Sequence, residues 1–191
     1  AAAAADAAHD HSSHDHAAAG LETGRGFYTL VASVLTAIGY AFLLGALFSR
    51  MGSVSWKQGI AWGLAGFAVF QLAPALGLPP APPGMPEADV SLRQTWWLGT
   101  VLASALGIAA CYFAYRRKQA ILALAGIALI AAPHLIGAPQ PVAGENLVPA
   151  ELARTFTIAA LLTAAVFWLL LGAVQGYLFS KLEQRRDAAL A

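Results

Sequence analysis

Five long apolar stretches set the strongest limit on how this chain can fold. They run over about 27–48, 56–76, 93–115, 120–136 and 155–179. About 20 apolar residues are needed for one helix to cross the ~30 Å of hydrocarbon in a bilayer. The chain also carries only 11% charged residues, against roughly 25% in soluble globular domains. The sequence therefore predicts a membrane protein with about five spans, of which 120–136 is the shortest.

Helices are the expected form of these spans. No stretch alternates apolar with polar residues, as the strands of a membrane barrel do. A soluble bundle would need a polar face on each helix, which the stretches lack. The predicted fold is all-α, a polytopic membrane helix bundle. Its transmembrane domain at 25–180 follows a His/Asp-rich external segment at 1–24 and precedes a basic cytoplasmic tail at 181–191.

The basic residues predict which way the chain faces. Eight lie in the gaps after the first and third stretches and in the C-terminal tail, against three in the alternate gaps. Cytoplasmic loops of membrane proteins carry the excess of lysine and arginine, so we expect the N-terminus outside and the C-terminus in the cytoplasm. The eight are Arg50, Lys57, Arg116, Arg117, Lys118, Lys181, Arg185 and Arg186.

A histidine-rich segment near the N-terminus is the strongest candidate for metal binding. Imidazole suits Co, Ni, Cu and Zn, and carboxylates add negative charge. The segment is too polar to fold alone, so a bound metal would be its main source of order, and binding should fail below about pH 6.5. A purification tag or a solvated linker is the alternative. The segment contains His9, Asp10, His11, His14, Asp15 and His16.

Two stretches, 65–79 and 125–139, resemble each other at a spacing of about sixty residues when one residue is inserted. Each is followed by a loop and by an arginine that opens the next span, Arg93 or Arg154. This predicts a parallel repeat of helix pairs, an arrangement that transporters use with sites at the repeat interface. Chance similarity between alanine- and glycine-rich helices is the alternative.

Both stretches contain a proline near the helix end, Pro74 and Pro133. Proline donates no backbone hydrogen bond, so it leaves carbonyls one turn earlier unpaired. These carbonyls either end the helix or face a water-filled vestibule that holds a cation. His134 follows Pro133 on the outer side and is a functional candidate, or an interfacial histidine that bonds a loop carbonyl. Gln71, in the corresponding turn, can hydrogen-bond across helices.

Other features limit the function. No nucleophile–base pair is visible, so we expect no enzyme activity. No phosphate-binding glycine loop is visible either, so we expect no ATP hydrolysis by this chain. No acid lies in the middle of a span, which counts against an autonomous transporter. The net charge of +1 gives no reason to expect a nucleic-acid partner. Small residues four apart should pack helices together, as should the lone Cys111. They are Gly59 and Gly63, then Gly99, Ala103 and Gly107, then Gly172 and Gly176.

The His/Asp-rich segment together with 72–80 and 133–141 resembles the predicted cobalt transporter subunit family, CbtA, over most of 9–180. The resemblance implies a polytopic protein of the bacterial inner (cytoplasmic) membrane, with cobalt as its divalent metal. It also implies a small single-span, histidine-bearing partner, CbtB. Gln71 stands where the family tends to have histidine. Relatives usually carry one more span before the histidine-rich loop, where only Ala1–Ala8 stand here, so either that helix is missing from this chain or the protein differs.

We therefore expect a membrane subunit of a divalent metal uptake system, with the bilayer as its surroundings. The histidine-rich segment would concentrate the ion at the outer face. His134, Gln71 and the carbonyls near Pro74 and Pro133 would form the entry to a pathway. The rival hypothesis is a structural or assembly subunit of a larger membrane complex without transport activity.

Overall fold

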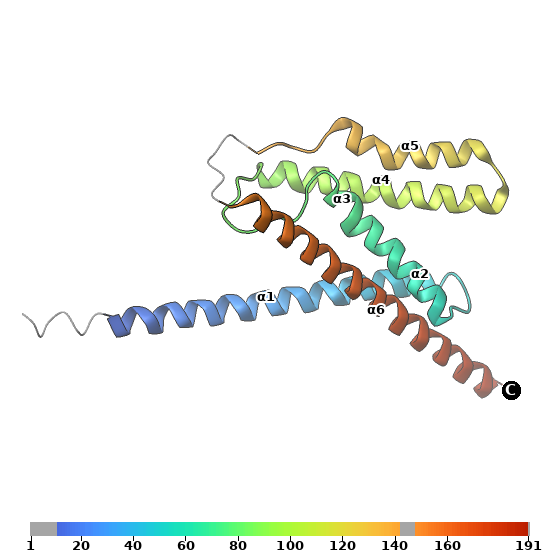
Figure 1. Cartoon of the computed structure of the whole chain (residues 1–191). Coiled ribbons are helices and arrows are strands. Elements are labelled where there is room, and N and C mark those ends of the chain that lie inside the picture. Colours follow the sequence, from blue (N-terminus) through green and yellow to red (C-terminus); the bar gives the residue numbers. More distant parts are fainter. Residues whose placement is uncertain (1–10, 142–147, 191) are drawn as a thin grey trace, which may run out of the picture. The chain divides into compact units, whose positions relative to one another are not determined.

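The computed structural model describes residues 11–141 and 148–190, with the backbone alone for 11–23. This part of the chain is all-α, as predicted (Figure 1). Its elements are α1 (His11–Phe48), α2 (Trp56–Phe67), η1 (Ala68–Leu72), α3 (Ala73–Ala75), α4 (Val90–Arg117), α5 (Ala120–Ile136) and α6 (Ala150–Leu190). Every apolar stretch of the sequence is thus helical.

Residues 1–49, which include helix α1, form one unit of the chain, and residues 50–191 form a second. The 38 residues of α1 begin at His11, so the backbone of the His/Asp-rich segment is helical from that residue on. The sequence predicted no order there without a metal. The difference follows from helix cooperativity, because lengthening a helix that already exists avoids the cost of nucleating a new one.

Three helices of the described residues are long and apolar enough to cross a membrane: Gly24–Phe48 of α1, then α4 and α6. Helix α5 coincides with the predicted stretch 120–136, and its 17 residues reach about 26 Å. Helices α2, η1 and α3 follow one another without a break, with 12, 5 and 3 residues. At ~1.5 Å per residue they span about 30 Å together. Within residues 50–191, α2 and α5 run in one direction and α4 and α6 in the other (Figure 1).

Helices α2 and α6 cross at positions where both helices have glycine. A side chain at Gly59 would overlap the backbone oxygen of Gly172, and one at Gly63 would overlap that of Trp168. A side chain at Gly176 would come within 3.0 Å of the Gly59 Cα. Membrane helices associate through such close backbone approach, since lipid is as apolar as the side chains it replaces. The predicted packing role of these glycines is confirmed.

Helices α4 and α5 form an antiparallel hairpin with a similar contact. A Cβ at Gly107 would lie 2.6 Å from the Gly126 oxygen, and one at Gly126 would lie 2.7 Å from the Cys111 sulfur. The Cys111 thiol donates to the Ala123 oxygen at 3.8 Å, so Cys111 packs as predicted. Gly99 differs, because nothing lies within 4 Å of its position, and the prediction that it packs helices is wrong. A spacing of four residues marks a helix face, but it does not say whether a neighbour covers that face.

The π-helical turn η1 lies directly before Pro74. The amide of Ala73 donates to the Ala68 oxygen, five residues earlier, in place of the α-helical partner four residues earlier. Such a turn is a one-residue insertion into an α-helix and occurs often at functional sites. It accounts for the one extra residue between Gly66 and Pro74 relative to Gly126 and Pro133, because α5 passes through Pro133 as an ordinary α-helix. The sequence predicted either the end of the helix or an open vestibule near Pro74, and the helix ends at Ala75, one residue later, after its winding has changed in η1.

The glycine crossing generates a stability prediction with a matched control. Gly172→Ala should lower the free energy of unfolding by about 1–3 kcal/mol, because its methyl group would meet the backbone of Gly59, which cannot yield without parting the helices. Gly99→Ala should be neutral or stabilise by up to about 1 kcal/mol through helix propensity. Unfolding of both variants in lipid–detergent micelles, followed by circular dichroism, measures the difference. Equal stabilities would contradict this crossing.

Candidate functional site

The ends of α3, α4 and α5 meet around the side chain of Trp96. The ring of Trp96, in the second turn of α4, stands edge-on to the imidazole of His134, with 6.0 Å between ring centroids and 69° between planes. A side chain at Gly77, just after α3, would overlap the Trp96 ring and approach the Ala138 Cβ to 3.1 Å. Glycine at 77 therefore makes room for this indole. The predicted candidate His134 thus lies where three segments converge.

His134 lies in the last turn of α5. Pro133 precedes it inside the helix, and Gly137 ends the helix with a positive φ of 91° and an amide that donates to the Pro133 oxygen at 3.0 Å. The His134 Nε2 atom is buried and has no hydrogen-bond partner among the described residues. No carbonyl of the loop segments that the structure describes therefore bonds Nε2. Burial without a partner is uncommon for a polar atom and calls for an explanation.

Trp96, like His134, has a buried polar atom without a hydrogen-bond partner among the described residues. Its Nε1 atom is buried without a hydrogen-bond partner, so the indole is held by packing against Gly77 and His134 rather than by a polar contact. Trp96 lies close to the start of a predicted span, where indoles often occupy the membrane interface. The structure adds that its ring is a wall of the His134 site. Nothing in the sequence linked the two residues, which are far apart along the chain.

Gln71 lies in η1, the turn that precedes Pro74. Its side chain is half-buried, and no hydrogen bond joins it to His134 within the described residues. Its neighbour Phe70 contacts both Trp97 of α4, with centroids 6.4 Å apart, and Trp168 of α6, stacked at 5.6 Å. The π-helical turn therefore contacts both of the helices that flank it. Gln71 thus belongs to a turn that packs against α4 and α6, and its predicted pairing with His134 stays a prediction.

The acids next to the site are already engaged. The Asp89 carboxylate caps the start of α4 and accepts from the amides of Ser91 at 2.9 Å and Leu92 at 3.3 Å, and from the Ser91 hydroxyl. Glu87 forms an ion pair with Arg93. These bonds hold the first turn of α4, and with it Trp96, in place. Neither carboxylate is therefore a ready ligand for a cation.

The site is poor in metal ligands by itself. Among the residues whose side chains the structure describes, no three of His, Cys, Asp and Glu gather closely enough to hold a metal ion. His134 supplies one imidazole, and a stable metal centre takes about four ligands or more. This arrangement can bind an ion in passing or contribute one ligand to a shared site. The remaining predicted ligands lie outside the described side chains: His9 and Asp10 entirely, and His11, His14, Asp15 and His16 except for their helical backbone.

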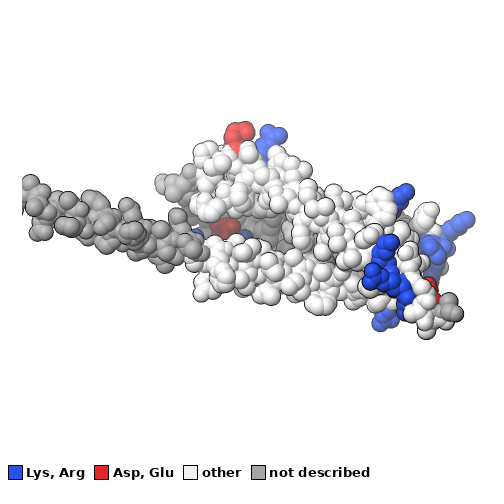
Figure 2. All heavy atoms as spheres, turned by 90° about the horizontal axis from the view of Figure 1, so that it is seen from below, with Lys and Arg blue, Asp and Glu red and all other residues white. Residues whose placement is uncertain are grey.

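The charges of residues 50–191 divide between the two ends of the helices. Most of the Lys and Arg side chains on the face shown in Figure 2 lie at the end formed by the α4–α5 turn and the C-terminal end of α6. Glu87, Asp89 and Glu151 lie at the opposite end, where α4 and α6 begin. His134 ends α5 and thus lies at this acidic end. Charge alone would bring a cation toward the end that carries His134.

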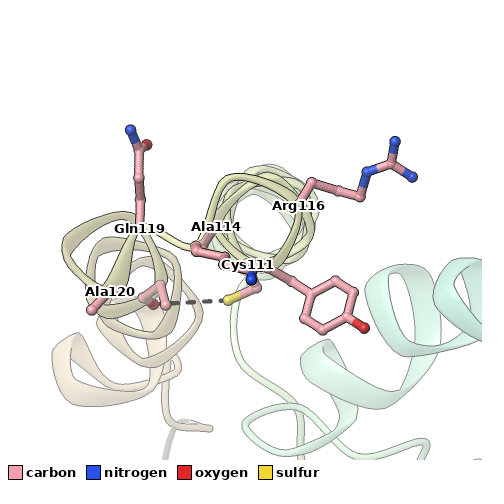
Figure 3. A pocket seen from close by; sticks show the side chains of 8 residues that line it. Cys111, Ala114, Arg116, Gln119 and Ala120 are labelled. Atoms are coloured by element: carbon pink, nitrogen blue, oxygen red, sulfur yellow. Dashed lines mark hydrogen bonds between the residues drawn. The ribbon is translucent and has the colours of Figure 1, made fainter.

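A shallow groove of about 700 Å³ lies at the basic end, between α4 and α5 (Figure 3). Cys111 points toward α5 on its floor, whereas the side chains of Arg116 and Gln119 point away from the Cys111 side. The groove is lined mainly by apolar atoms and its only soft ligand is one thiol. It lacks the ligand set of a metal site, so His134 is the better candidate.

The loop between α3 and α4 is tied to α6. The Thr157 hydroxyl lies 2.8 Å from the Pro80 oxygen and 3.0 Å from the Ala153 oxygen, one turn earlier in its own helix. Proline-rich loops offer few donors of their own, so this side-chain contact fixes the loop above the site. The roles of Thr157, Trp96 and Gly77 at this site do not follow from the sequence, because they depend on which helices become neighbours.

Comparison with known proteins gives one result at the level of the family. Residues 1–180 match the model of a family described as probable cobalt transporter subunit (CbtA). No curated protein matches the chain, and no solved structure matches it either.

The cap of α4 gives a prediction on pH. The hydroxyl of Ser91, followed by the amides of Leu92 and Ser91, holds the pKa of the Asp89 carboxyl below its ordinary value. The folded pKa is thus below the unfolded one of about 3.9, so the cap is fully effective above that pH and is lost as pH falls through the folded pKa. Carbon-13 NMR of the carboxyl should give the low pKa, and Asp89→Asn, which still accepts hydrogen bonds, should remove this part of the acid dependence of stability. An ordinary pKa for Asp89 would contradict the cap.

Proposed function

Because the chain belongs to the family of probable cobalt transporter subunits, we propose that it captures a divalent cation at the outer face of the bacterial inner membrane and passes it inward. The ion is Co²⁺ in this proposal. His134 is its first ligand within the membrane, at the convergence of α3, α4 and α5.

The buried, unpartnered Nε2 of His134 is the observation that carries the proposal. An imidazole nitrogen is a good ligand for Co²⁺ and similar ions. Leaving it without a hydrogen-bond partner costs stability, and such a cost is typical of sites that a ligand completes. The Trp96 ring beside it, with 6.0 Å between centroids, lowers the number of waters that can compete for the ion.

The histidine-rich segment acts upstream of His134. Its imidazoles and carboxylates raise the local concentration of the cation, and the acidic residues near the start of α4 and α6 favour cations at the same end. We place this end outside the cell, because the opposite end carries the excess of lysine and arginine. The ion would then move down the membrane potential as it enters.

The route inward passes between α4, α5 and the π-helical turn. Pro74 has no amide hydrogen, and the bond from Ala73 to Ala68 shows that the backbone is rewound there. Irregular backbone at membrane depth is tolerated where protein or a water-filled cavity surrounds it. Gln71 is in this turn, and its amide can assist a hydrated ion on the wall that faces α4.

The repeat of helix pairs remains part of the proposal, and the helix contacts support it. A shift of about 60 residues forward in sequence aligns α2 with α5. A shift of about 61 residues back aligns α6 with α4, so that Arg154 corresponds to Arg93. The contact of Gly63 with Gly172 then falls on that of Ala123 with Cys111. In the same way the contact of Gly66 with Trp168 falls on that of Gly126 with Gly107. The pairs α2–α6 and α4–α5 are thus equivalent, with His134 near their junction.

A partner is needed to complete the ligand set. His134 is one ligand, and the described residues around it bring no second imidazole. A small single-span partner with a histidine at its outer end, of the CbtB kind, would supply the missing nitrogen. The apolar side chains exposed on α5, such as Ile121 and Leu124, leave room on this helix for such a partner or for lipid.

Cobalt uptake by cells tests the proposal. His134→Ala should reduce uptake of Co²⁺ at low concentration at least about tenfold, because the loss of one ligand weakens capture. Replacing His9, His11, His14 and His16 together should raise the Co²⁺ concentration needed for half-maximal uptake while sparing the maximal rate. Leu135→Ala, which alters the exposed neighbour of His134, is the matched control and should transport normally. All variants must reach the membrane in equal amounts.

Unchanged uptake in both histidine variants would overturn the proposal. The rival hypothesis, a structural or assembly subunit of a larger complex, would then gain support if the protein co-purifies in fixed ratio with such a complex and holds no metal. Elemental analysis of the purified protein separates the two directly.

Sidedness can be measured independently of transport. With Cys111 replaced by serine, His14→Cys should react with a membrane-impermeant thiol reagent in intact cells, because it lies outside. Arg185→Cys, near the end of α6, should react only after the membrane is opened. Labelling of both positions in intact cells would show that the outer-face assignment is wrong.

A further inference from the structure

The hydroxyl group of Ser104 lies in the middle of α4 without a hydrogen-bond partner. Ser104 is 1% exposed, and it stands about midway between Val90 and Arg117, the two ends of the helix. For a helix that crosses a bilayer, this is the deepest part of the hydrocarbon. No role was assigned to Ser104 by the sequence or by the proposed function.

Ser104 differs from other hydroxyl residues of the spans. Thr95 and Thr100, on the same helix, donate to the carbonyl four residues earlier at 2.8 and 2.9 Å. This bond to the residue's own helix is the usual way to satisfy a helical hydroxyl. Three residues of α1 do the same: Thr29, Ser33 and Thr36. Ser104 makes no such bond, so its hydroxyl is left for a group from outside its own helix.

Helix geometry gives the direction in which Ser104 faces. With about 100° per residue, Ser104 lies roughly 20° around the helix from Trp97 and roughly 60° from Gly107. Trp97 contacts Phe70 of η1, and Gly107 contacts Gly126 of α5. Ser104 therefore lies on the face of α4 between its contact with the π-helical turn and its contact with α5.

The polar residues of this face begin at the His134 site. Trp96 contacts His134, and Thr100 and Ser104 follow at intervals of four residues, which places Ser104 about 12 Å further along α4. Thr100 is fully buried, and its hydroxyl oxygen retains a lone pair while its proton bonds to Trp96. The row therefore leads from the outer end of α4 to its middle.

We propose that Thr100 and Ser104 continue the cation path inward from His134, with their hydroxyl oxygens solvating the ion or its bound waters at mid-membrane. This inference rests on the proposed function. Hydroxyl oxygens bind a divalent ion more weakly than imidazole or carboxylate does. A path needs such weak sites, because an ion that is held tightly in the middle of the membrane would not leave.

Uptake measurements test the role of the oxygen. Ser104→Ala and Thr100→Val should each lower the Co²⁺ uptake rate by about tenfold, since an oxygen that interacts with a charged group is lost. Thr95→Val is the matched control: it removes a hydroxyl with the same intrahelical bond from an exposed position on the same helix, and it should transport normally. Normal uptake by both Ser104→Ala and Thr100→Val would overturn the inference.

Chemical access to position 104 gives a second measurement that does not depend on transport. In a Cys111→Ser background, Ser104→Cys should react with a small water-soluble methanethiosulfonate, and excess Co²⁺ should slow that reaction at least several-fold. Leu135→Cys, at the outer end and 85% exposed, is the positive control, and Ala105→Cys, exposed on the outside of α4, should not react. No reaction at Ser104→Cys while Leu135→Cys reacts would overturn the inference.

The two proposals fail in different ways. If His134→Ala transports Co²⁺ normally while Ser104→Cys reacts and is protected by Co²⁺, the path exists and the entry ligand is wrong. If His134→Ala blocks uptake while position 104 is inaccessible and Ser104→Ala is normal, the entry ligand stands and the path runs elsewhere.

Discussion

Hydrocarbon offers no hydrogen-bond partner to a peptide group, and most of this structure follows from that constraint. Each apolar stretch becomes a helix because a helix pairs its own amides and carbonyls. The ends need other partners: Ser55 and Gln58 cap α2 through a reciprocal pair of bonds, and Asp89 caps α4. Next to Pro74 the helix rewinds into a π-turn, and it then ends at Ala75. Irregularity is thereby confined to one turn, and this turn borders the candidate path.

The same solvent removes the usual reason for helices to associate. Apolar side chains gain little by leaving lipid for protein, so contacts depend on how closely two backbones can approach. Glycines supply this approach twice, where α2 crosses α6 and where α4 lies against α5. Small residues recur at both crossings, and they are also the most persistent feature of the weak internal similarity of the sequence.

Polar groups are few within the spans, so their position carries information. His134, Trp96 and Ser104 each bury a polar atom that no protein group satisfies, and Trp96 links the first to the face of α4 that leads to the third. A chain built only for packing would have no reason to retain these groups, because each costs stability. They are consistent with a cargo that brings its own charge and waters. The paucity of strong ligands fits a subunit that hands an ion on, in contrast to a storage site that keeps it.

Local pattern was enough to predict which residues are helical and which end of the chain's spans is basic. The length of the apolar stretches and the apolar solvent determine which residues are helical. The distribution of lysine and arginine along the chain determines which end of the spans is basic. The bounds of α5 followed from such local signals, as did the choice of His134 after Pro133 as a candidate. Which helices lie next to each other could not be predicted from these local signals. Gly99 belongs to the same four-residue series as Gly107, yet nothing lies within 4 Å of its position. Trp96 contacts His134, which belongs to another helix. Ser104 cannot be distinguished from other helical serines by its sequence. Only the tertiary structure decides these, because a side chain's surroundings depend on which helix faces it, and in lipid a few glycine contacts make that choice.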